Sequence, residues 1–537
     1  MTSWLWWVTG GILLALPFMF DAMVWTVIPG LMAWLHGIET SRVGMFCKGY
    51  LSGFIFVYLS LWWLFQLSIV IHLITAAFFA LYVGILASVT GRIHHQLNVP
   101  GWLIAPAGIY LMEFLPEYVT LFPVTWLHFG HLLWQWPQAM QIAELGGVSL
   151  LTAVLMVVAS GFYYGGRALV QNRIAAFRYR ATWIPVLAAL SAVLLTLGYG
   201  HGRLIRLDLQ PLLRVAVVQA NIPQALRTHD ENATAVITEH AEMTLALRDQ
   251  PVDLALWPES SVRYFLERSE NIPLYLGHLT REIRSPLLLG AIGFNGNQTP
   301  PSNSAFLIDA SGQLVGRADK MVLVPFAERL PLIEHFPLLR DKVSGLLSQT
   351  MRFRPHLTAG SESGVLVFGE HRIGVMICYD DAVPGPSAAL LKQGAQALAT
   401  LSNEAWFADR ELTQHVAMAT LRCIETRLPM VRATHTGETC IIDPAGRITK
   451  RLEHNQRDIL IGTLHKTDTY RVPAWIRLSM HCGVSLITLI AFIICYWPRA
   501  VTVISQSRLL RRDSSASAPW GEDSGRPGHS DSRSHKS

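Results

Sequence analysis

Long apolar segments fill the first two hundred residues of this 537-residue chain. Hydrophobic residues make up 51% of the sequence and charged residues only 15%, a balance more typical of a membrane protein than of a soluble enzyme. A helix needs about 20 apolar residues to cross a bilayer core, and several of these segments reach that length. Candidate spans begin near Ser3, Met23, Tyr50, Ile69, Trp102, Leu121, Gly147 and Trp183.

We expect residues 1–205 to form a bundle of about seven membrane-spanning helices. Prolines and glutamates interrupt the stretch 100–137, so we expect one span there together with shorter interfacial pieces. The apolar run starts at Trp4 without a Lys/Arg-rich region before it, and further apolar segments follow at once. We therefore expect the first span to stay in the membrane rather than to be cleaved as a signal peptide.

The composition changes at about residue 212. From there to residue 470 the chain carries ordinary charge density, and short β-forming runs alternate with helical stretches. This alternation predicts an α/β domain of about 260 residues with a core of its own. A last apolar span is expected over 475–497, and residues 512–537 have almost no core-forming side chains, which predicts a disordered tail.

Two arginine clusters predict the orientation, since basic loops tend to stay in the cytoplasm. One cluster lies in the loop 166–181 and the other follows the span 475–497. If both are cytoplasmic, the α/β domain between them lies on the extracytoplasmic side and the C-terminus lies inside. The arginines are Arg167, Arg173, Arg178 and Arg180 in the loop, and Arg499, Arg508, Arg511 and Arg512 after the last span.

The net charge of +5 is small, and it fits membrane topology better than a nucleic-acid surface. Six cysteines are scattered without CxxC or zinc-like spacing, which predicts neither a disulfide framework nor a metal site. Cys423 and Cys440 could pair, although nothing in the sequence requires it. We expect no cofactor.

One of these cysteines, Cys378, ends a run of β-forming residues, 373–377, and a turn-prone acidic segment follows it. This layout places a thiol at the mouth of a buried strand, where a nucleophile can meet a substrate. Most cysteines in apolar surroundings are nevertheless small core residues. The catalytic interpretation therefore depends on partners elsewhere in the chain.

Polar residues accompany several other predicted strands. Glu259 follows the run 252–257, and Asn403 follows the run that starts at Ala397. Lys320 precedes another apolar run, and Glu328 comes eight positions after it. Because ligands of open α/β folds bind at the carboxyl ends of strands, this alignment predicts one shared pocket.

Three of these segments resemble the Glu-Lys-Cys constellation of the nitrilase superfamily: Trp257-Pro258-Glu259, Lys320 with 324–328, and Ile377-Cys378-Tyr379. The resemblance is more specific to one membrane branch, the apolipoprotein N-acyltransferases, and it covers nearly the whole chain except the tail. It implies an α-β-β-α sandwich joined to a helical membrane bundle. The further motifs are 219–224, 401–407, 414–419, Arg422, Glu425, Pro429 and 432–434.

The chemistry of the three residues can be stated from their side chains. A free thiol is mostly protonated at neutral pH, so Cys378 needs a base, and the carboxylate of Glu259 can accept that proton. Lys320 can stabilise the oxyanion of a tetrahedral intermediate. The product is a thioester, which donates its acyl group to an amine or to water.

The resemblance implies the substrates. An acyl chain from a phospholipid would move to Cys378 and then to the α-amino group of a lipoprotein's diacylglyceryl-cysteine, at the periplasmic face of a bacterial inner membrane. Glu328, Tyr379 and Asp380 would support the site, and Asn403 and Trp406 would shape its pocket. The amphipathic segment 338–353 is expected to form a lid or lipid portal.

The chain departs from the family pattern at several positions. Asp380 stands where a glutamate is usual, Thr228 replaces a tryptophan and His435 replaces an asparagine. Glu259, Lys320 and Cys378 match the family pattern, so we expect the catalytic chemistry to be retained. The departures leave the identity of the acyl acceptor undetermined. A membrane-tethered amidase with water as the acceptor is the alternative, and a non-catalytic scaffold is a third possibility.

Each site residue also has a structural interpretation. Glu259 can cap a helix, Lys320 can be a surface lysine, and Asn403 can be a turn residue. Trp406 can belong to the core, and His415 is expected to be a structural residue of a helix rather than a base. Only the joint occurrence of the three catalytic candidates, each in its own motif, favours catalysis.

Overall fold

The computed structural model describes residues 2–66, 68–118, 125–172, 180–227, 230–297, 299–325, 327–330, 357–360, 364–404 and 409–513, with single residues 336, 338, 342, 343 and 345. The chain divides into two compact units, Met1–Thr488 and Leu489–Ser537. The first unit contains both the apolar N-terminal region and the α/β region. In the second, the described residues belong to the last part of α15 (Ala474–Asp513).

The N-terminal region is a helical bundle. Four helical segments of the described chain are long and apolar enough to cross a membrane: Ile69–Leu97, Ala143–Val170, Thr182–Ile205 and Ala474–Cys495. Ser3–Met19 and Met45–Ser60 are apolar but shorter. The protein is thus a membrane protein, and seven crossings in 1–205 stay a prediction. The longer helices are α1 (Thr2–Met19), α2 (Val27–Thr40), α3 (Met45–Ser60), α4 (Ile69–Leu97), α5 (Gly101–Tyr118), α7 (Ala143–Asn172) and α8 (Arg180–Ile205).

The helices α3 and α4 pack closely because α3 presents two glycines, four residues apart, to its neighbour. A Cβ atom on Gly49 would lie 2.5 Å from the Cβ of Ala87, and one on Gly53 would lie 2.7 Å from the Cβ of Val83. Small residues at this spacing let the backbones of membrane helices approach each other. The close contact therefore depends on the absence of both side chains.

After α5, the described part of the 100–137 stretch contains no second long helix. Residues 125–140 form only the short helices η3 (Phe129–Leu133) and α6 (Pro137–Met140). At the other end of the chain, α15 continues past the expected span end at 497, through Pro498, and reaches Asp513. The expected tail, 512–537, otherwise lies outside the described residues.

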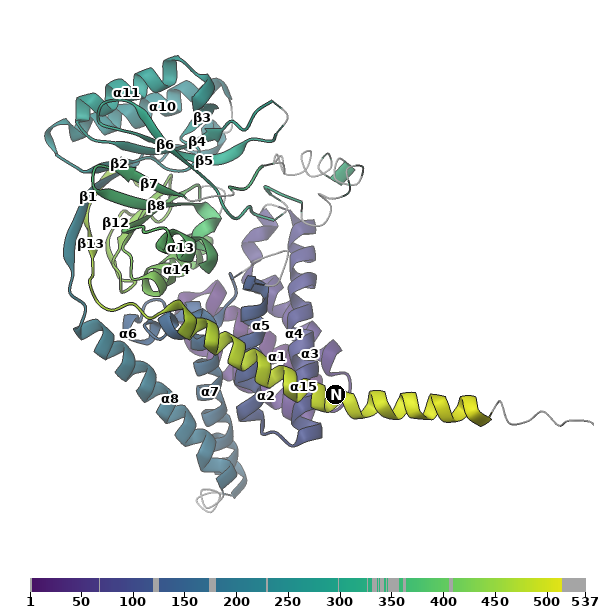
Figure 1. The fold of residues 1–537 in the computed structure, drawn as a ribbon. Helices are drawn as coiled ribbons and strands as arrows, with labels where there is room; N and C mark the ends of the chain where they lie inside the picture. The colour runs from purple at the N-terminus through teal and green to yellow at the C-terminus, as the bar shows by residue number, and fades with distance from the viewer. Residues whose placement is uncertain are drawn as a thin grey trace, which may run out of the picture. The chain divides into compact units, whose positions relative to one another are not determined.

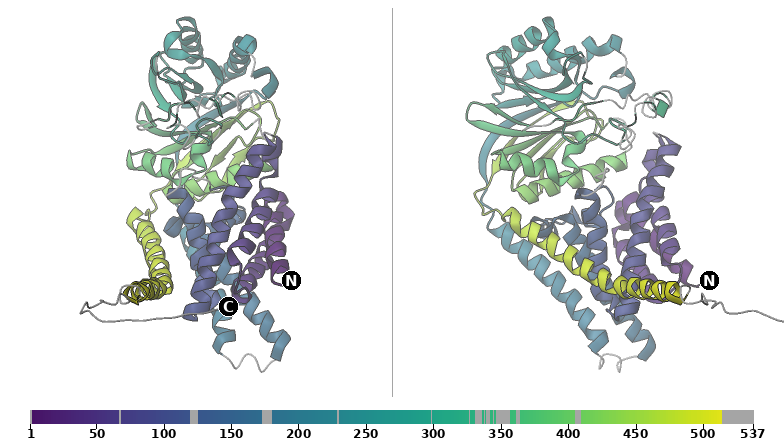
Figure 2. Two further views of the ribbon diagram at one scale, coloured as in Figure 1. Left: turned by 90° about the vertical axis from the view of Figure 1, so that its right-hand side faces the viewer. Right: turned by 45° about the vertical axis from the view of Figure 1, so that its right-hand side comes forward.

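The α/β region is built on two sheets, whose strands lie in two layers (Figure 2). The first sheet has the order β13-β1-β2-β4-β5-β6, with β3 paired to β4, and the second has the order β12-β11-β10-β9-β8-β7. The first contains β1 (Gln210–Gln219), β2 (Leu254–Leu256), β3 (Val262–Phe265), β4 (Leu287–Gly293), β5 (Ser302–Ile308), β6 (Leu314–Asp319) and β13 (Asp458–Lys466). The second contains β7 (Val365–Phe368), β8 (His371–Ile377), β9 (Ala397–Ser402), β10 (Met430–Thr434), β11 (Cys440–Ile442) and β12 (Ile448–Arg451).

Alternating side chains of the strands fill two kinds of core. Val215 and Val217 of β1 pack between the sheets against side chains of the second sheet such as Ile373, whereas Ala216 and Val218 pack under helices. The helices α10 (Ala233–Thr244) and α11 (Asn271–Ile283) cover the first sheet, and α13 (Pro384–Lys392) and α14 (Asp409–Thr426) cover the second (Figure 1). The expected nitrilase-like α-β-β-α sandwich is confirmed.

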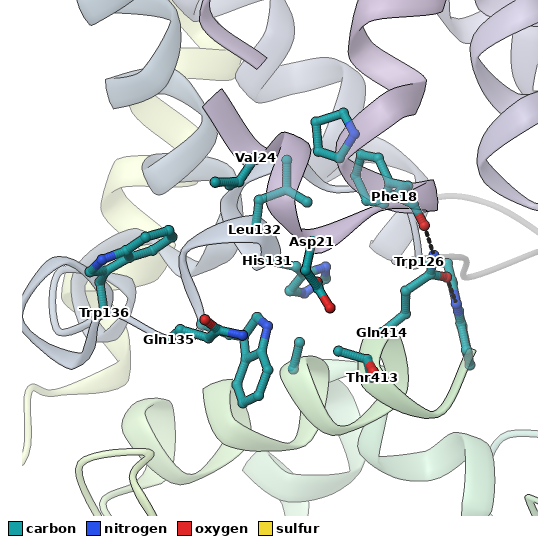
Figure 3. A pocket seen from close by; sticks show the side chains of 13 residues that line it. Phe18, Asp21, Val24, Trp126, His131, Leu132, Gln135, Trp136, Thr413 and Gln414 are labelled. Carbon is teal, nitrogen blue, oxygen red and sulfur yellow. Dashed lines mark hydrogen bonds between the residues drawn. The ribbon is translucent and has the colours of Figure 1, made fainter. Parts of the chain in front are cut away.

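The helix α14 faces the bundle and binds to it at both of its ends. Near its start, the Gln414 amide contacts the bundle through Trp126 (Figure 3). Just after its end, the Arg427 guanidinium pairs with Glu144 at 2.8 Å and donates to the side-chain oxygen Oε1 of Gln141 at 2.7 Å. The α/β region is therefore attached to the bundle by buried polar contacts as well as by chain connections. Cys423, on the same helix, is buried and free, as is Cys440.

Candidate active site

The nucleophile candidate lies at the junction of β8 and a short 3-10 helix, η9 (Cys378–Asp381). Cys378 has φ of 51°, a left-handed conformation that few residues other than glycine adopt. The carboxylate of Asp380 accepts a hydrogen bond from the N–H of Ile377 at 3.0 Å and so holds this turn closed. The turn places Cys378, which is partly exposed, at the carboxyl end of β8.

Lys320 and Glu259 meet beside this turn. Lys320 directly follows β6, its side chain is only 1% exposed, and its Nζ lies 2.8 Å from Oε1 of Glu328 and 4.0 Å from Oε1 of Glu259. The charges of Lys320 and Glu259 both act on the Cys378 thiol. The structure thus brings Glu259, Lys320 and Cys378 into one group, as the strand ends predicted.

The carboxylate of Glu259 is fixed by two donors. The Asn303 side-chain amide donates to Oε1 at 2.5 Å, and the backbone N–H of Asn403 donates to Oε2 at 2.7 Å. Both oxygens are therefore oriented, and Oε1 also lies 4.0 Å from Nζ of Lys320. Behind it, His435 contacts the carbonyl oxygen of Glu259 through Nε2 at 2.7 Å.

The environment of the site shifts the pKa values of all three groups. Burial, reinforced by the negative charge of Glu259, raises the pKa of the Cys378 thiol well above its usual value, although Lys320 opposes this shift. Burial also raises the pKa of Glu259, while Lys320 lowers it. For Lys320, burial alone would lower the pKa, but Glu328, Cys378 and Glu259 together raise it. Burial and neighbouring charges thus raise the pKa values of Cys378, Glu259 and Lys320 alike.

Glu328, Tyr379 and Asp380, which were expected to support the site, lie close to Lys320 and Cys378. Glu328 holds Lys320 and also accepts the N–H of Val324 at 2.8 Å, so it orders the loop between them. The Tyr379 ring is nearly parallel to that of Trp126, at 6.0 Å between centroids. Asp380 is fully buried, and it accepts the N–H of Val322 at 2.7 Å as well as that of Ile377.

The aspartate at position 380 is therefore a link between two loops. It joins the cysteine turn to the residues that follow Lys320, and burial raises the pKa of this carboxyl to about 7. Asn403 was expected to shape the pocket with its side chain. Its backbone N–H instead donates to Glu259, and its side-chain oxygen accepts a hydrogen bond from the Arg227 guanidinium at 2.7 Å. Trp406, Thr228 and most of the expected lid 338–353 lie outside the described residues.

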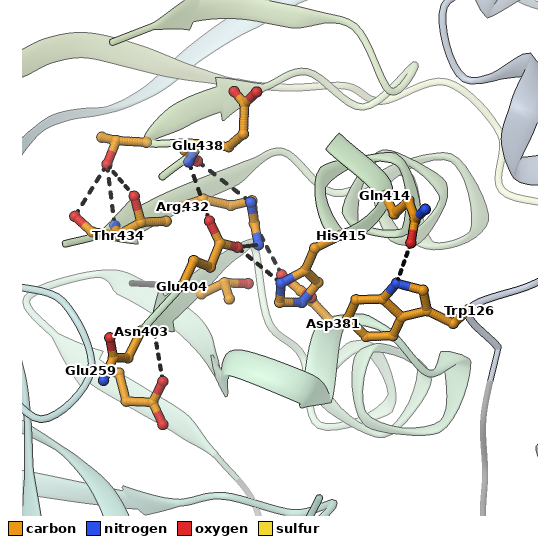
Figure 4. Close-up of polar contacts among 12 residues, drawn as sticks. Trp126, Glu259, Asp381, Asn403, Glu404, Gln414, His415, Arg432, Thr434 and Glu438 are labelled. Carbon is orange, nitrogen blue, oxygen red and sulfur yellow. Dashed lines mark hydrogen bonds and ion pairs between the residues drawn. The ribbon is translucent and has the colours of Figure 1, made fainter. Parts of the chain in front are cut away.

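A buried charge network supports the site from the side of α14, and sequence reasoning missed it. Its members are Asp381, Glu404, His415 and Arg432, all at most 1% exposed (Figure 4). His415 pairs with Asp381 at 2.7 Å and with Glu404 at 2.9 Å, and Arg432 pairs with the same carboxylates at 3.1 and 2.6 Å. Burial would lower the pKa of His415, but Asp381 and Glu404 raise it to about 10.

The network joins the Cys378 turn to the loop whose Asn403 N–H holds Glu259, because Asp381 ends η9 and Glu404 directly follows Asn403. His415 was expected to be a structural helix residue rather than a base, and its place between two carboxylates agrees with that expectation. Asn303 and Arg227 are further contacts that no motif indicated. In the described parts of the chain, no three His, Cys, Asp or Glu side chains are arranged to hold a metal ion.

Two family models match the chain: "Carbon-nitrogen hydrolase" over residues 214–474 and "Apolipoprotein N-acyltransferase N-terminal domain" over residues 10–161. Among solved structures, an amidase from Nesterenkonia sp. aligns with 50% of this chain and 97% of its own, at 17% identity and a TM-score of 0.39.

Curated relatives named apolipoprotein N-acyltransferase align with much of the sequence. The protein from Geobacter metallireducens is 29% identical over 64% of this chain and 64% of its own length. The protein from Azotobacter vinelandii is 31% identical over 67% of this chain and 66% of its own length. Each of these two alignments therefore spans slightly less than two thirds of the relative's length. The relative from Agrobacterium fabrum is 27% identical over 90% of this chain and 93% of its own. The chain thus belongs to the apolipoprotein N-acyltransferase family, a membrane branch of the nitrilase superfamily.

Proposed function

We propose that the protein is an N-acyltransferase that moves a fatty acyl chain from a phospholipid to the α-amino group of a lipoprotein's diacylglyceryl-cysteine, through a thioester on Cys378. Glu259 is the general base and acid, and Lys320 stabilises the oxyanion. Glu328, Tyr379, Asp380 and Asn403 hold these groups in place.

In the first half-reaction, Glu259 takes the thiol proton as the sulfur attacks the carbonyl carbon of the lipid ester. The negative charge that develops on the carbonyl oxygen is stabilised by the Lys320 ammonium group. The C–O bond of the ester then breaks, and the proton on Glu259 passes to the departing lysophospholipid oxygen. The enzyme is left with an acyl thioester and an ionised Glu259.

In the second half-reaction, the amine of the lipoprotein attacks the thioester carbonyl. Glu259 accepts a proton from the attacking nitrogen, the C–S bond breaks, and the thiolate recovers the proton from Glu259. The products are an amide and the free Cys378 thiol. No cofactor is needed, because each step only transfers a proton or an acyl group.

The observation that most supports a lipid substrate is the continuity of the apolar core. Tyr379 and Val383, which flank the cysteine turn, belong to the same apolar cluster as Phe56 and Trp63 of the bundle, and Val324 of the lysine loop packs against that cluster. An acyl chain that leaves a bilayer therefore has apolar surroundings up to the catalytic turn. A site for a soluble amide has no need of this continuity.

We place the α/β domain in the periplasm of a bacterial inner membrane and the C-terminus in the cytoplasm. The arginine clusters on either side of the domain support this orientation. Labelling of intact cells with a membrane-impermeant amine reagent tests it: Lys392, on the exposed side of α13, should react, whereas labelling only after lysis would reverse the orientation.

Mass spectrometry of the purified protein tests the reaction. Incubation with phospholipid should add a long-chain acyl group to Cys378, and a diacylated lipopeptide should remove it and become triacylated. The Cys378→Ala variant is the control and should acquire no adduct. Turnover of small amides without any adduct from phospholipid would instead establish the alternative, an amidase that uses the same three residues with water.

A further inference from the structure

Glu259 and Cys378 belong to different sheets of the α/β region. Glu259 comes shortly after β2 of the first sheet, whereas Cys378 directly follows β8 of the second. The position of one relative to the other therefore depends on contacts that cross between the sheets. One such contact is the N–H of Asn403, after β9 of the second sheet, which donates to the Glu259 carboxylate (Figure 4). A second contact reaches the backbone of Glu259, and it comes from His435.

His435 directly follows β10, which lies two strands from β8 in the second sheet. Its side chain is fully buried, and its Nε2 lies 2.7 Å from the carbonyl oxygen of Glu259. A carbonyl oxygen can only accept a hydrogen bond, so Nε2 carries a proton and donates it. The second sheet thus holds Glu259 both by its carboxylate and by its backbone.

The surroundings of His435 favour a neutral ring. The other ring nitrogen, Nδ1, is buried and has no hydrogen-bond partner among the described residues, so a proton there would have no acceptor. The ring of His240, on α10, lies nearly perpendicular to it at 5.7 Å between centroids. Burial, together with Arg227 and His240, holds the pKa of His435 well below its usual value, although the hydrogen bond to Glu259 opposes this shift. The hydrogen bond to Glu259 therefore comes from an uncharged imidazole near pH 7.

The backbone at Glu259 is also in close contact with its own sheet. A Cβ atom on Gly290 of β4 would lie 2.6 Å from the Cα atom of Glu259 and 2.6 Å from the nitrogen of Ser260. Ser260 has φ of 55°, a left-handed conformation. Without the His435 hydrogen bond, this tight turn would keep its contact with β4 but lose its backbone tie to the sheet that carries Cys378.

We propose that His435 is a positioning residue for the acyl transfer: its neutral Nε2–H group holds the backbone of Glu259 where the carboxylate can act on the Cys378 thiol. The inference rests on the proposed function, because that function makes Glu259 the base. Asparagine is usual at this position in the family pattern, and its amide nitrogen corresponds in reach to Nδ1 of histidine rather than to Nε2. In this chain the hydrogen bond therefore depends on the longer side chain.

Three substitutions of His435 test the role of the donor. His435→Leu removes it and should slow acylation of Cys378 about 10–100-fold at unchanged KM for the lipid, because a small displacement of a reacting group costs about that much. His435→Gln places an amide N–H near the position of Nε2 and should restore the rate to within about threefold of wild type. His435→Asn has the same amide on a shorter side chain, and it should be as slow as His435→Leu. The rates come from mass spectrometry of the full-length protein in detergent, over a series of phosphatidylethanolamine concentrations.

A double variant tests whether the effect passes through Glu259. Glu259→Gln removes the base but keeps the backbone carbonyl, so adding His435→Leu to it should cause no further slowing. His240→Leu is the matched control: it also removes a fully buried histidine, but His240 donates to Val236 of its own helix and makes no hydrogen bond to Glu259. This control should acylate Cys378 at nearly the wild-type rate, and thermal unfolding of each variant shows whether it is folded.

A wild-type rate in His435→Leu would overturn the proposal, and so would equal slowing by His240→Leu or a further loss in the double variant. If His435→Leu does not fold, the comparison of His435→Gln with His435→Asn decides, and equal rates in these two variants would refute the role of the donor.

A second acyl donor separates this proposal from the proposed function. 4-Nitrophenyl butyrate is a short activated ester that needs no lipid site, and each acylation of the Cys378 thiol releases one molecule of 4-nitrophenol. We expect the same order of rates among the His435 variants with this ester. That order together with no acylation by phospholipid would refute the proposed function and support the role of His435. Equal phospholipid rates in wild type and His435→Leu would refute only the role of His435.

Discussion

Arg432→Met is predicted to destabilise the protein strongly, because it unbalances a buried charge network. Asp381 and Glu404 carry two negative charges there, and His415 and Arg432 carry two positive ones, within 2.6 to 3.1 Å of each other. Methionine has a similar length and no charge, so the variant leaves two buried carboxylates facing one imidazolium. Breaking a buried ion pair in this way costs about 3–5 kcal/mol.

For a domain of about 260 residues, this loss lowers Tm by roughly 6–20 °C. The assay is thermal unfolding of the full-length protein in one detergent at one scan rate, because membrane proteins often unfold irreversibly. Arg447→Met is the matched control: this arginine pairs with Asp443, its side chain is 43% exposed, and its loss should cost about 0–1 kcal/mol.

The charge balance of the same network leads to a second prediction. Adding Glu404→Gln to Arg432→Met restores neutrality, since Asp381 and His415 remain as a pair. The double variant should therefore be more stable than Arg432→Met alone, by about 0.5–3 kcal/mol. A double variant whose Tm falls by the sum of the two single losses would refute the charge-balance argument.

Three further predictions concern the catalytic group and the bundle. Burial raises the pKa of Glu259, so acylation of Cys378 should fall as the pH drops through a value above the ordinary carboxyl range. Asn303→Leu should move this fall in acylation to higher pH, because the hydrogen bond from Asn303 lowers the pKa of Glu259. Site-specific alkylation of Cys378 at a series of pH values measures both effects. Lys320→Met should slow thioester formation about 10²–10³-fold at unchanged lipid affinity, as followed by mass spectrometry, and a normal rate would remove Lys320 from the oxyanion role. Gly49→Leu should destabilise the bundle by about 1–3 kcal/mol in thermal unfolding, whereas a wild-type Tm would show that α3 and α4 can separate freely.

The residues that the sequence could place are those that end strands. Cys378 and Asn403 follow β8 and β9, parallel neighbours of the second sheet whose carboxyl ends meet at one edge, whereas Glu259 follows β2 of the first sheet. That rule is local and periodic, so it can be applied without knowing the fold. The α-β-β-α sandwich followed in the same way from alternation of strands and helices, together with the family resemblance.

The residues that escaped prediction act through contacts between distant parts of the chain. Asn303 lies in the middle of the chain and holds Glu259 across the sheet from β5, and nothing in its neighbourhood distinguishes it from a surface asparagine. Asp381 and Arg432 are 51 residues apart, and their pairing follows only from the packing of the second sheet against α14. Such contacts depend on tertiary structure, which neither composition nor periodicity encodes.

The cysteine turn is also held from the membrane side. The Thr125 hydroxyl donates to the carbonyl oxygen of Ala382 at 2.5 Å, and Trp126, one residue further, lies against Tyr379 while its indole N–H donates to Gln414 at 2.8 Å. Two consecutive bundle residues thus complete the surroundings of a turn that belongs to the α/β domain. A chain whose bundle has not formed therefore lacks these two contacts with the turn that carries Cys378, so the geometry of that turn depends on the bundle as well as on the α/β domain.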